Sequence, residues 1–355
     1  MLPLLDEIQN AVSRVVASGW FLNGTQVKAF EHAFAEYNTT EFSVSVANGT
    51  DALEIALRAV GVGSGDEVVT VANAGGYSTT AILAIGATPV YADVDEYSLL
   101  VDSDSVLRCM SPRTRAVVIT HLYGRIANVD AIQQLIGSKV PVVEDCAQAH
   151  GGKLGQRRVG GLGAASAFSF YPTKNLGGCG DAGMVLTSDP LVATSARELS
   201  QYGWKSRYDA RRPGGRNSRM DEIQAAILLA KLPHLERWNE ERRHIASRID
   251  HAVKGTDAKL VSVSDKNHCV FHLMVTEHSD RERFRERLGA QGVDTAVHYP
   301  ILDCDQIAFA NRFRMDDLER SRTAVERILT LPGFPGMTDQ QLHVVELALK
   351  SEMSQ

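Results

Sequence analysis

The chain has 355 residues, of which 44% are hydrophobic, and this is enough for one large domain and a smaller one. Its 37 lysines and arginines are outnumbered by 43 acidic residues, so the formal charge of -6 leaves no basic surplus for a nucleic-acid backbone. No apolar run approaches the ~18 residues that cross a bilayer, and the first 20 residues have the pattern of an amphipathic helix rather than a secretion signal.

The cysteines argue for a reducing compartment. There are five of them, without a C-x-x-C pair, so neither a disulfide framework nor a zinc site is indicated. We therefore expect a cytoplasmic protein without a metal ion, a membrane or a nucleic acid among its partners.

Short β-branched runs alternate with helical stretches from residue 42 to residue 188. In chain order these segments are FSVSVA, DALEIALRAVG, DEVVTVA, TTAILAIGA, PVYADV, AVVITHLYG and PVVEDCA, followed by AASAFSF and GMVLTS. This alternation predicts an α/β fold, with a mostly parallel sheet covered by helices on both faces.

The pattern changes near residue 191 to long, charged amphipathic helices. The main one is EIQAAILLAKLPHLERWNEERRHIASRIDHAV, after which HCVFHLMV and DTAVHY are strand candidates around the helix RERFRERLGAQG. We expect a large domain at residues 1–240 and a small C-terminal α/β domain at residues 241–355. Between the two patterns, residues 207–220 form a basic, glycine-containing loop, and long ordered loops are often functional.

Residues at the carboxyl ends of the predicted strands are the candidates for a ligand site. The first strand runs through Gly49 and Thr50 directly into a helix, whose free N–H groups and dipole suit a phosphate. A plain helix start, capped by Thr50 or Asp51, is the alternative and is favoured when the segment is considered alone.

Asp145 ends another apolar run and is followed by Gln148. A carboxylate there can hold a pyridinium N–H as an ion pair, although capping of the next segment explains Asp145 equally well. A metal site at Asp145 and His150 is less favoured, because no third ligand lies nearby in the sequence.

Lys174 lies in FSFYPTKNLGGCGDAG, between an apolar strand that ends at Ser169 and a glycine-rich loop. An amine shielded from water in this way would have a lowered pKa and could form a Schiff base; an ordinary solvated lysine is the alternative. Asn217 lies before a helix in the basic loop, where a simple Asn or Ser cap would explain the pattern.

Taken in order, these segments resemble the DegT/DnrJ/EryC1/StrS family of sugar aminotransferases, which are fold-type I pyridoxal-phosphate enzymes. The resemblance runs from SGWFLNGTQVKAFEHAFAEY through ANGTDALEIALRAVGVGSGDEVV, GATPVYADVD, VVEDCAQAHGG, FSFYPTKNLGGCGDAG and GRNSRMDEIQAAIL to VHYP and LPGFPGMT. It implies a sheet of seven-stranded type in a large domain, with a smaller C-terminal domain.

The resemblance also implies the roles of individual residues. Lys174 would bind pyridoxal 5'-phosphate covalently and act in catalysis with Asp145, which would pair with the pyridine nitrogen. Other cofactor contacts are implied for Gly49, Thr50, Gln148, Ser169 and, from the neighbouring subunit of a homodimer, Asn217.

Two segments depart from the family pattern. Many members have a Ser/Thr-Phe-x-Ala-Thr stretch where this chain has NAGGYST at residues 73–79, so we assign the aromatic residue that packs on the cofactor to Tyr77. After VHYP, the family often has a histidine where this chain has LDCDQ with Cys304. We expect His298 and Tyr299 to contact the substrate.

The resemblance implies transfer of an amino group, usually from glutamate, through a pyridoxamine 5'-phosphate form of the cofactor, to a nucleotide-linked keto sugar. The two departing segments favour C3 of a dTDP-linked 3-keto-6-deoxyhexose and a 3-amino product. Amination at C4 of a 4-keto sugar and amination of a cyclitol ketone are the alternatives. A regulatory protein that binds the cofactor without turnover is less favoured, because Lys174, Asp145, Gln148 and Ser169 are all present, and Lys174 argues against a related dehydratase with histidine at that position.

Overall fold

The computed structural model describes residues 4–262 and 268–351. Its helices are α1 (Leu5–Ser18), α2 (Thr25–Asn38), α3 (Gly49–Ala59), α4 (Tyr77–Ile85), α5 (Ser103–Cys109), α6 (Val129–Ile136), α7 (Pro190–Leu199), α8 (Glu222–Lys231), α9 (Leu235–Ala252), α10 (Arg281–Ala290), α11 (Glu319–Arg327) and α12 (Asp339–Lys350). Its strands are β1 (Phe42–Val46), β2 (Glu67–Val71), β3 (Thr88–Ala92), β4 (Thr114–Thr120), β5 (Val142–Asp145), β6 (Lys153–Leu154), β7 (Arg157–Arg158), β8 (Ala165–Ser169), β9 (Gly183–Thr187), β10 (Trp204–Ser206), β11 (Asp209–Ala210), β12 (Lys259–Leu260), β13 (Met274–Glu277), β14 (Arg314–Met315) and β15 (Ile328–Leu331).

The central sheet has the strand order β1-β9-β8-β5-β4-β2-β3-β14. Only β9 runs antiparallel to its neighbours in this sheet, while the pairs from β8 to β14 are parallel. The mostly parallel sheet predicted from the sequence is therefore confirmed. The eighth strand, β14, comes from the C-terminal part of the chain and extends the sheet at its edge.

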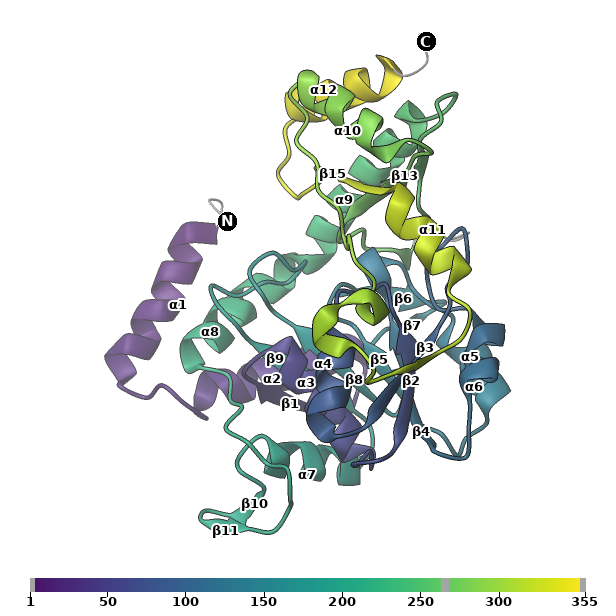
Figure 1. Cartoon of the computed structure of the whole chain (residues 1–355). Helices are drawn as coiled ribbons and strands as arrows, with labels where there is room; N and C mark the ends of the chain where they lie inside the picture. The colour runs from purple at the N-terminus through teal and green to yellow at the C-terminus, as the bar shows by residue number, and fades with distance from the viewer. Residues whose placement is uncertain (1–3, 263–267, 352–355) are drawn as a thin grey trace.

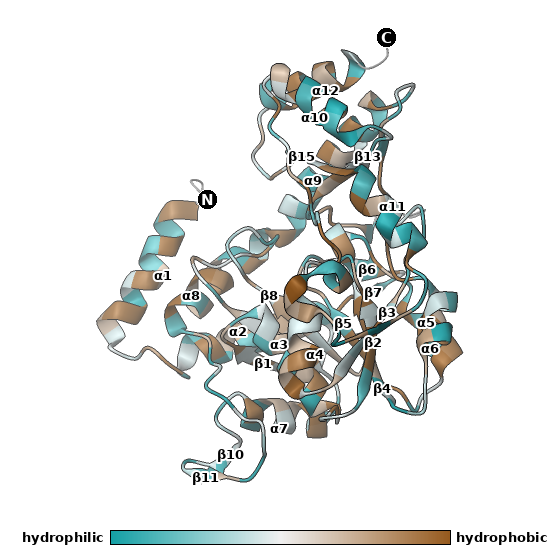
Figure 2. Ribbon diagram, viewed as in Figure 1, coloured by the Kyte–Doolittle hydropathy of each residue, from teal (hydrophilic) through white to brown (hydrophobic). Residues whose placement is uncertain are grey.

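Helices cover both faces of the sheet because successive side chains along each buried strand point to opposite sides. Val68 belongs to the hydrophobic cluster that contains residues of α3, α4 and α7, whereas the adjacent Val69 belongs to the cluster that contains residues of α2, α5, α6 and α8. Brown, hydrophobic segments alternate with teal, hydrophilic ones along the helices that flank the sheet (Figure 2), as expected for helices with one buried side.

The C-terminal part forms a second body above the sheet, around the three-stranded sheet β12-β13-β15 (Figure 1). Its core contains Ile245 and Ile249 of α9, Phe284 of α10 and Leu349 of α12. The proposed division at residue 240 falls within α9, which continues from the large body into this second core.

Two strand predictions in this region need correction. In HCVFHLMV only the last two residues belong to β13, and the preceding residues form loop and turn. DTAVHY forms no strand beyond a single bridge between Ala296 and Thr330. Its last two residues, His298 and Tyr299, line the cavity described below.

The amphipathic N-terminal helix is confirmed as α1, which stands beside α8 at the side of the molecule (Figure 1). Its apolar face, with Ile8, Ala11 and Val15, packs on α8. No helix among the described residues is both long and apolar enough to span a membrane, and all five cysteines are free thiols.

Candidate active site

A cavity of about 770 Å³ opens at the carboxyl ends of the parallel strands. The structure brings nearly all of the predicted site residues to its wall. They are Gly49, Thr50, Tyr77, Asp145, Gln148, Ser169, Lys174, His298 and Tyr299. This is where ligands bind in open α/β sheets, since the strand ends deliver side chains from many parts of the chain to one edge.

One end of the cavity is built to accept an anion. Helix α3 begins at Gly49, where a Cβ atom would lie 2.6 Å from that of Ser169, so only glycine lets the Ser169 side chain approach the helix start. The side chain of Asn48 caps the helix by accepting a hydrogen bond from Asp51 N–H at 2.8 Å, which corrects the expectation of a Thr50 or Asp51 cap. The first N–H groups of the helix, including that of Thr50, have no acceptor within it and suit a phosphate.

Lys174 lies deep in the same cavity, after the turn that follows β8. Its backbone N–H donates to Tyr171 O at 2.8 Å, which closes a tight turn and directs the side chain inward. Burial lowers the pKa of the Lys174 amine, and the nearby Asp145 carboxylate partly opposes this effect. A lowered pKa increases the fraction of neutral, nucleophilic amine at neutral pH.

Asp145 closes the floor of the cavity at the end of β5. Its carboxylate accepts hydrogen bonds from Ala147 N–H at 3.1 Å and from the Thr120 hydroxyl at 3.3 Å. Burial raises the pKa of Asp145, while these donors and the Lys174 ammonium favour the ionised form. A cationic ligand against this carboxylate would complete its neutralisation.

Gln148 joins the floor of the cavity to its wall. Its amide oxygen accepts from Tyr123 N–H at 2.5 Å, and its amide nitrogen donates to the Tyr299 hydroxyl at 2.9 Å. Tyr299 in turn meets the ring of Tyr77 edge to face, with 6.2 Å between the centroids. Tyr77 is 49% exposed, so this aromatic pair stands at the mouth of the cavity.

The C-terminal part of the chain supplies the opposite wall, and only part of that wall was predicted. His298 donates to or accepts from the Thr330 hydroxyl at 2.9 Å, and burial together with Lys174 lowers its pKa. Arg242 and His272 also line the cavity, and sequence reasoning missed both. Arg242 lies in a charged helix whose pattern suggests a solvated surface, so only its place on the buried stripe of α9 could have revealed it.

Asn217 is the predicted site residue that the structure does not bring to this cavity. It is exposed and forms a backbone bridge with Gln201. The adjacent Ser218 is buried and accepts from Ala47 N–H at 3.0 Å, near the end of β1. The capping alternative is wrong, because α8 begins after Asp221 rather than after Asn217 or Ser218.

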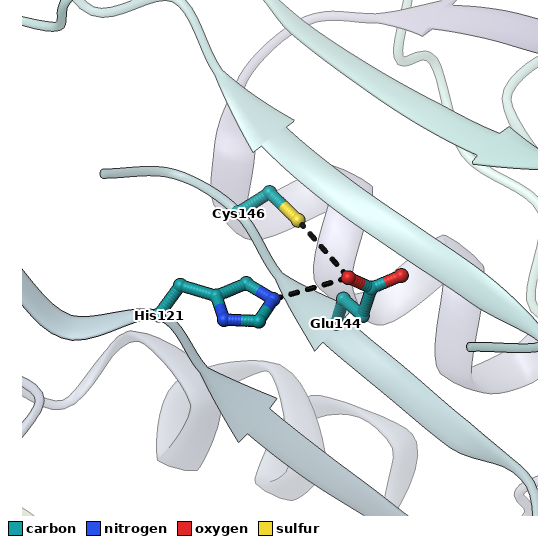
Figure 3. A group of neighbouring side chains, drawn as sticks. All are labelled: His121, Glu144 and Cys146. Atoms are coloured by element: carbon teal, nitrogen blue, oxygen red, sulfur yellow. Dashed lines mark hydrogen bonds and ion pairs between the residues drawn. The ribbon is translucent and has the colours of Figure 1, made fainter. Parts of the chain in front are cut away.

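A cluster of His121, Glu144 and Cys146 lies in the core below the cavity (Figure 3). The Glu144 carboxylate accepts from the N–H groups of Gly160, Leu162 and His121 Nε2 at 2.8–3.0 Å, with Gly163 N–H as a further donor. His121 Nδ1 accepts from a backbone N–H at 3.1 Å, so the ring is the neutral Nε2-protonated form. All these ligand atoms are occupied, and we interpret the cluster as a structural link between β5 and the loop before β8.

A second cavity, of about 810 Å³, lies between α7 and the β10-β11 hairpin. It is similar in size to the first, but none of the predicted site residues lines it. Its wall includes Trp204, Tyr208 and Arg219 around an open surface. Size alone therefore does not identify the site of chemistry in this molecule.

The cavity at the strand ends fits pyridoxal 5'-phosphate. Gly49, Thr50 and Ser169 offer donors for its phosphate, Asp145 a carboxylate for its ring nitrogen, and Lys174 an amine of lowered pKa for its carbonyl. The fold and this set of side chains define a pyridoxal-phosphate-dependent aminotransferase.

The chain belongs to the DegT/DnrJ/EryC1/StrS aminotransferase family, whose model matches residues 4–350. It is 38% identical to a dTDP-3-amino-3,4,6-trideoxy-alpha-D-glucose transaminase of Streptomyces venezuelae, over 96% of this chain and 90% of the relative. It is 36% identical to a UDP-N-acetyl-3-dehydro-alpha-D-glucosamine 3-aminotransferase of Acidithiobacillus ferrooxidans, over 96% and 92%.

A solved structure gives the same assignment. The crystal structure of DesV from S. venezuelae with a ketimine intermediate superposes with a TM-score of 0.94 at 37% identity, covering 99% of this chain and 96% of that chain. The protein is thus a sugar aminotransferase that uses pyridoxal phosphate, as the sequence predicted.

Proposed function

We propose that this enzyme transfers the amino group of L-glutamate to C3 of a nucleotide-linked 3-keto sugar, with a dTDP-linked 3-keto-6-deoxyhexose as the substrate. The names of the two relatives above support the carbon, because both describe an amine at C3 although one sugar carries dTDP and the other UDP. The first of them supports the deoxysugar.

The cavity carries the chemical part of the proposal. Bound pyridoxal phosphate supplies an electron sink that takes up and returns the amino group. Lys174 holds the cofactor between turnovers, and its freed amine moves protons to and from the reacting carbon. Asp145 keeps the ring nitrogen protonated through an ion pair, which strengthens that sink.

In this proposal, the part of the cavity wall formed by Tyr77, His298 and Tyr299 orients the sugar substrate. An enzyme for C3 must present a different edge of the hexose to the cofactor than an enzyme for C4. Hydroxyl groups of the sugar are then either hydrogen-bonded or left unpaired, which discriminates by roughly a thousandfold. The Tyr299 hydroxyl is held by Gln148 and can serve as such a partner.

The test is an amino-transfer reaction with L-glutamate and either a 3-keto or a 4-keto dTDP-sugar, with the nitrogen-bearing carbon located by NMR. We expect turnover of the 3-keto sugar to a C3 amine. Exclusive formation of a C4 amine would overturn the C3 assignment. Turnover of a cyclitol ketone, without turnover of either sugar, would identify a cyclitol ketone as the substrate instead.

The proposal includes a homodimer in which Asn217 reaches the cofactor phosphate in the partner's cavity. Asn217 is exposed and lies outside the cavity of its own chain. Large exposed aromatic residues lie in the same part of the chain or beside it, including Trp20, Tyr202 and Tyr208, and such patches mark interfaces.

Subunit mixing tests the shared site. Lys174→Ala and Asn217→Ala homodimers should each be impaired, and exchange of their subunits should restore part of the activity, because one site of each heterodimer has both residues intact. Sedimentation should give a dimer. A monomer with full activity, or no recovery after verified exchange of impaired variants, would contradict the shared site.

A further inference from the structure

A chain of buried side-chain hydrogen bonds ends at His272 on the cavity wall. Asn239 of α9 is 0% exposed, and its Nδ2 donates to the His150 carbonyl at 2.8 Å. Asn175 Nδ2 donates to Asn239 Oδ1 and to the Val270 carbonyl, both at 2.9 Å. The other amide atom of Asn175, Oδ1, lies 3.0 Å from His272 Nδ1.

Two backbone carbonyls determine the polarity of this chain. A carbonyl oxygen only accepts, so the Asn175 atom that faces the Val270 carbonyl must be its NH₂ group. The His150 carbonyl orients Asn239 in the same way. The atom of Asn175 that faces His272 is therefore an oxygen, and His272 Nδ1 must carry the proton that it accepts. In a neutral imidazole with this proton, Nε2 is unprotonated and can only accept a hydrogen bond.

His272 remains neutral in the cavity. It is 7% exposed, and burial, together with the positive charges of Lys174 and Arg242, holds its pKa well below the ordinary 6.5. Its ring lines the same cavity as Lys174, and Nε2 is not enclosed, although it has no hydrogen-bond partner within residues 4–262 and 268–351. An unpaired acceptor on the wall of a cavity favours a ligand that supplies a donor.

We propose that His272 Nε2 accepts a hydrogen bond from an N–H or O–H group of a bound substrate, and that Asn175 is the positioning residue that fixes this tautomer. The inference rests on the proposed function and deepens it, because the amine of the amino donor and the hydroxyl groups beside the keto carbon are groups of this kind. Keto and carboxylate oxygens have no proton to donate. Asn175 directly follows Lys174, so its amide also joins the turn that carries the reactive lysine to the wall from the C-terminal part.

Two substitutions of His272 separate the roles of its ring nitrogens. An asparagine side chain places its amide near the position of Nδ1, so His272→Asn keeps the bond to Asn175 but loses the acceptor in the cavity. A glutamine side chain reaches the position of Nε2, so His272→Gln keeps an acceptor there but loses the bond to Asn175. We expect His272→Asn to weaken the binding of the substrate that supplies the donor by about 10-fold or more. His272→Gln should lower the stability but weaken that binding less.

Two binding measurements identify the source of the donor. Holoenzyme mixed with L-glutamate alone converts to the pyridoxamine form, and the concentration dependence of the absorbance change gives the apparent dissociation constant of glutamate. Calorimetry gives the dissociation constant of the keto-sugar nucleotide. Weaker binding of glutamate in His272→Asn assigns the donor to its amine, and weaker binding of the nucleotide assigns it to a sugar hydroxyl. Unchanged binding of both, or weakening in His272→Gln that equals that in His272→Asn, would overturn the role of Nε2.

His150 provides the matched control. It is also a buried histidine, 0% exposed and with a pKa lowered to about 3, chiefly by burial, but it does not line the cavity. His150→Asn should leave both dissociation constants unchanged. Equal weakening in His150→Asn and His272→Asn would overturn the proposal, because loss of any buried imidazole would then explain the effect. Failure of the wild-type enzyme to react with glutamate or to bind a nucleotide sugar would instead contradict the proposed function.

The positioning role of Asn175 has its own test. Asn175→Leu, which is similar in volume but has no acceptor, should weaken binding of the same substrate as His272→Asn. The double variant should weaken it no further, because both changes act through Nε2. Additive effects would remove Asn175 from this role.

A neutron structure of the wild-type enzyme tests the tautomer without a substrate or a variant, and so covers the case in which the variants do not fold. It should show a proton on His272 Nδ1 and none on Nε2. A proton on Nε2 would refute the inference.

Discussion

Asp303 should make the stability of this protein fall as the pH rises. Its side chain is 1% exposed and accepts a hydrogen bond from the Thr79 hydroxyl at 2.5 Å, while its second oxygen, Oδ1, has no partner among the described residues. Burial raises the pKa of Asp303 from 3.8 to about 7, although the Thr79 hydroxyl and Gly76 N–H favour the ionised form. The Tyr91 phenol interacts electrostatically with this carboxyl group.

The direction follows from proton binding. The folded state keeps the Asp303 proton up to about pH 7, whereas the unfolded chain loses it near pH 4, so the folded state binds more protons between these values. The free energy of unfolding therefore decreases as the pH rises through this window. The full effect is about 4 kcal/mol, of which about 2.5 kcal/mol falls between pH 5 and pH 8.

Asp303→Asn removes the ionisation but keeps an oxygen for Thr79 and Gly76. Urea unfolding of the holoenzyme at pH 5, 6.5 and 8 should show the variant gaining stability relative to wild type by about 2.5 kcal/mol from pH 5 to pH 8. The control is Asp305→Asn, an exposed carboxylate in the same segment that pairs with Arg322 at 2.8 Å. Parallel pH profiles for wild type and Asp303→Asn would refute the reasoning.

Three further changes test the site and its support. Lys174→Ala should abolish the covalent cofactor adduct that borohydride reduction fixes. Lys231→Ala is the control and should keep the adduct, because Lys231 lies outside the cavity although it is also buried and has a lowered pKa. Mass spectrometry that located the adduct on another residue would contradict the assignment. Asp145→Asn should retain the bound cofactor, detected by absorbance, but reduce kcat by about 100-fold or more, and unchanged kcat would remove Asp145 from the mechanism. Glu144→Gln should lower the free energy of unfolding by about 2–4 kcal/mol, because its amide NH₂ would face backbone N–H donors; stabilisation of wild type by added zinc would instead favour a metal site.

The sheet could be predicted because its strands are short β-branched runs separated by helical patterns. Such alternation is typical of a parallel sheet whose two faces are both covered by helices. The carboxyl ends of those strands then placed Asp145 and Ser169 near Lys174 without knowledge of any distance. The wall from the C-terminal part could not be predicted in the same way. Arg242 belongs to a helix rich in charges, and its burial depends on carbonyls that lie 29 to 91 residues further along the chain.

The two segments that depart from the family pattern prove to be one structural feature. Gly75 lies against the Tyr299 ring, where a Cβ atom would be 2.9 Å from ring carbons, and Gly76 lies against the Phe309 ring, where a Cβ atom would be 3.2 Å from a ring carbon. Both glycines have positive φ, which a side chain would strain further. Tyr299 in VHYP and Phe309 after it therefore require the Gly-Gly turn that positions Tyr77.

Residues 73–79 and residues 299–309 are far apart in the sequence but are in contact in the structure. Asp303 N–H donates to Ala72 O at 2.8 Å, and its carboxylate holds the start of α4 through Thr79, so the segment 302–309 determines where Tyr77 stands. A substitution in either segment alone would leave a clash or an unpaired group in the other. Conversion of the sugar specificity should thus require the 73–79 turn and the 299–309 segment to be exchanged together, because the edge of the hexose that reaches the cofactor depends on both.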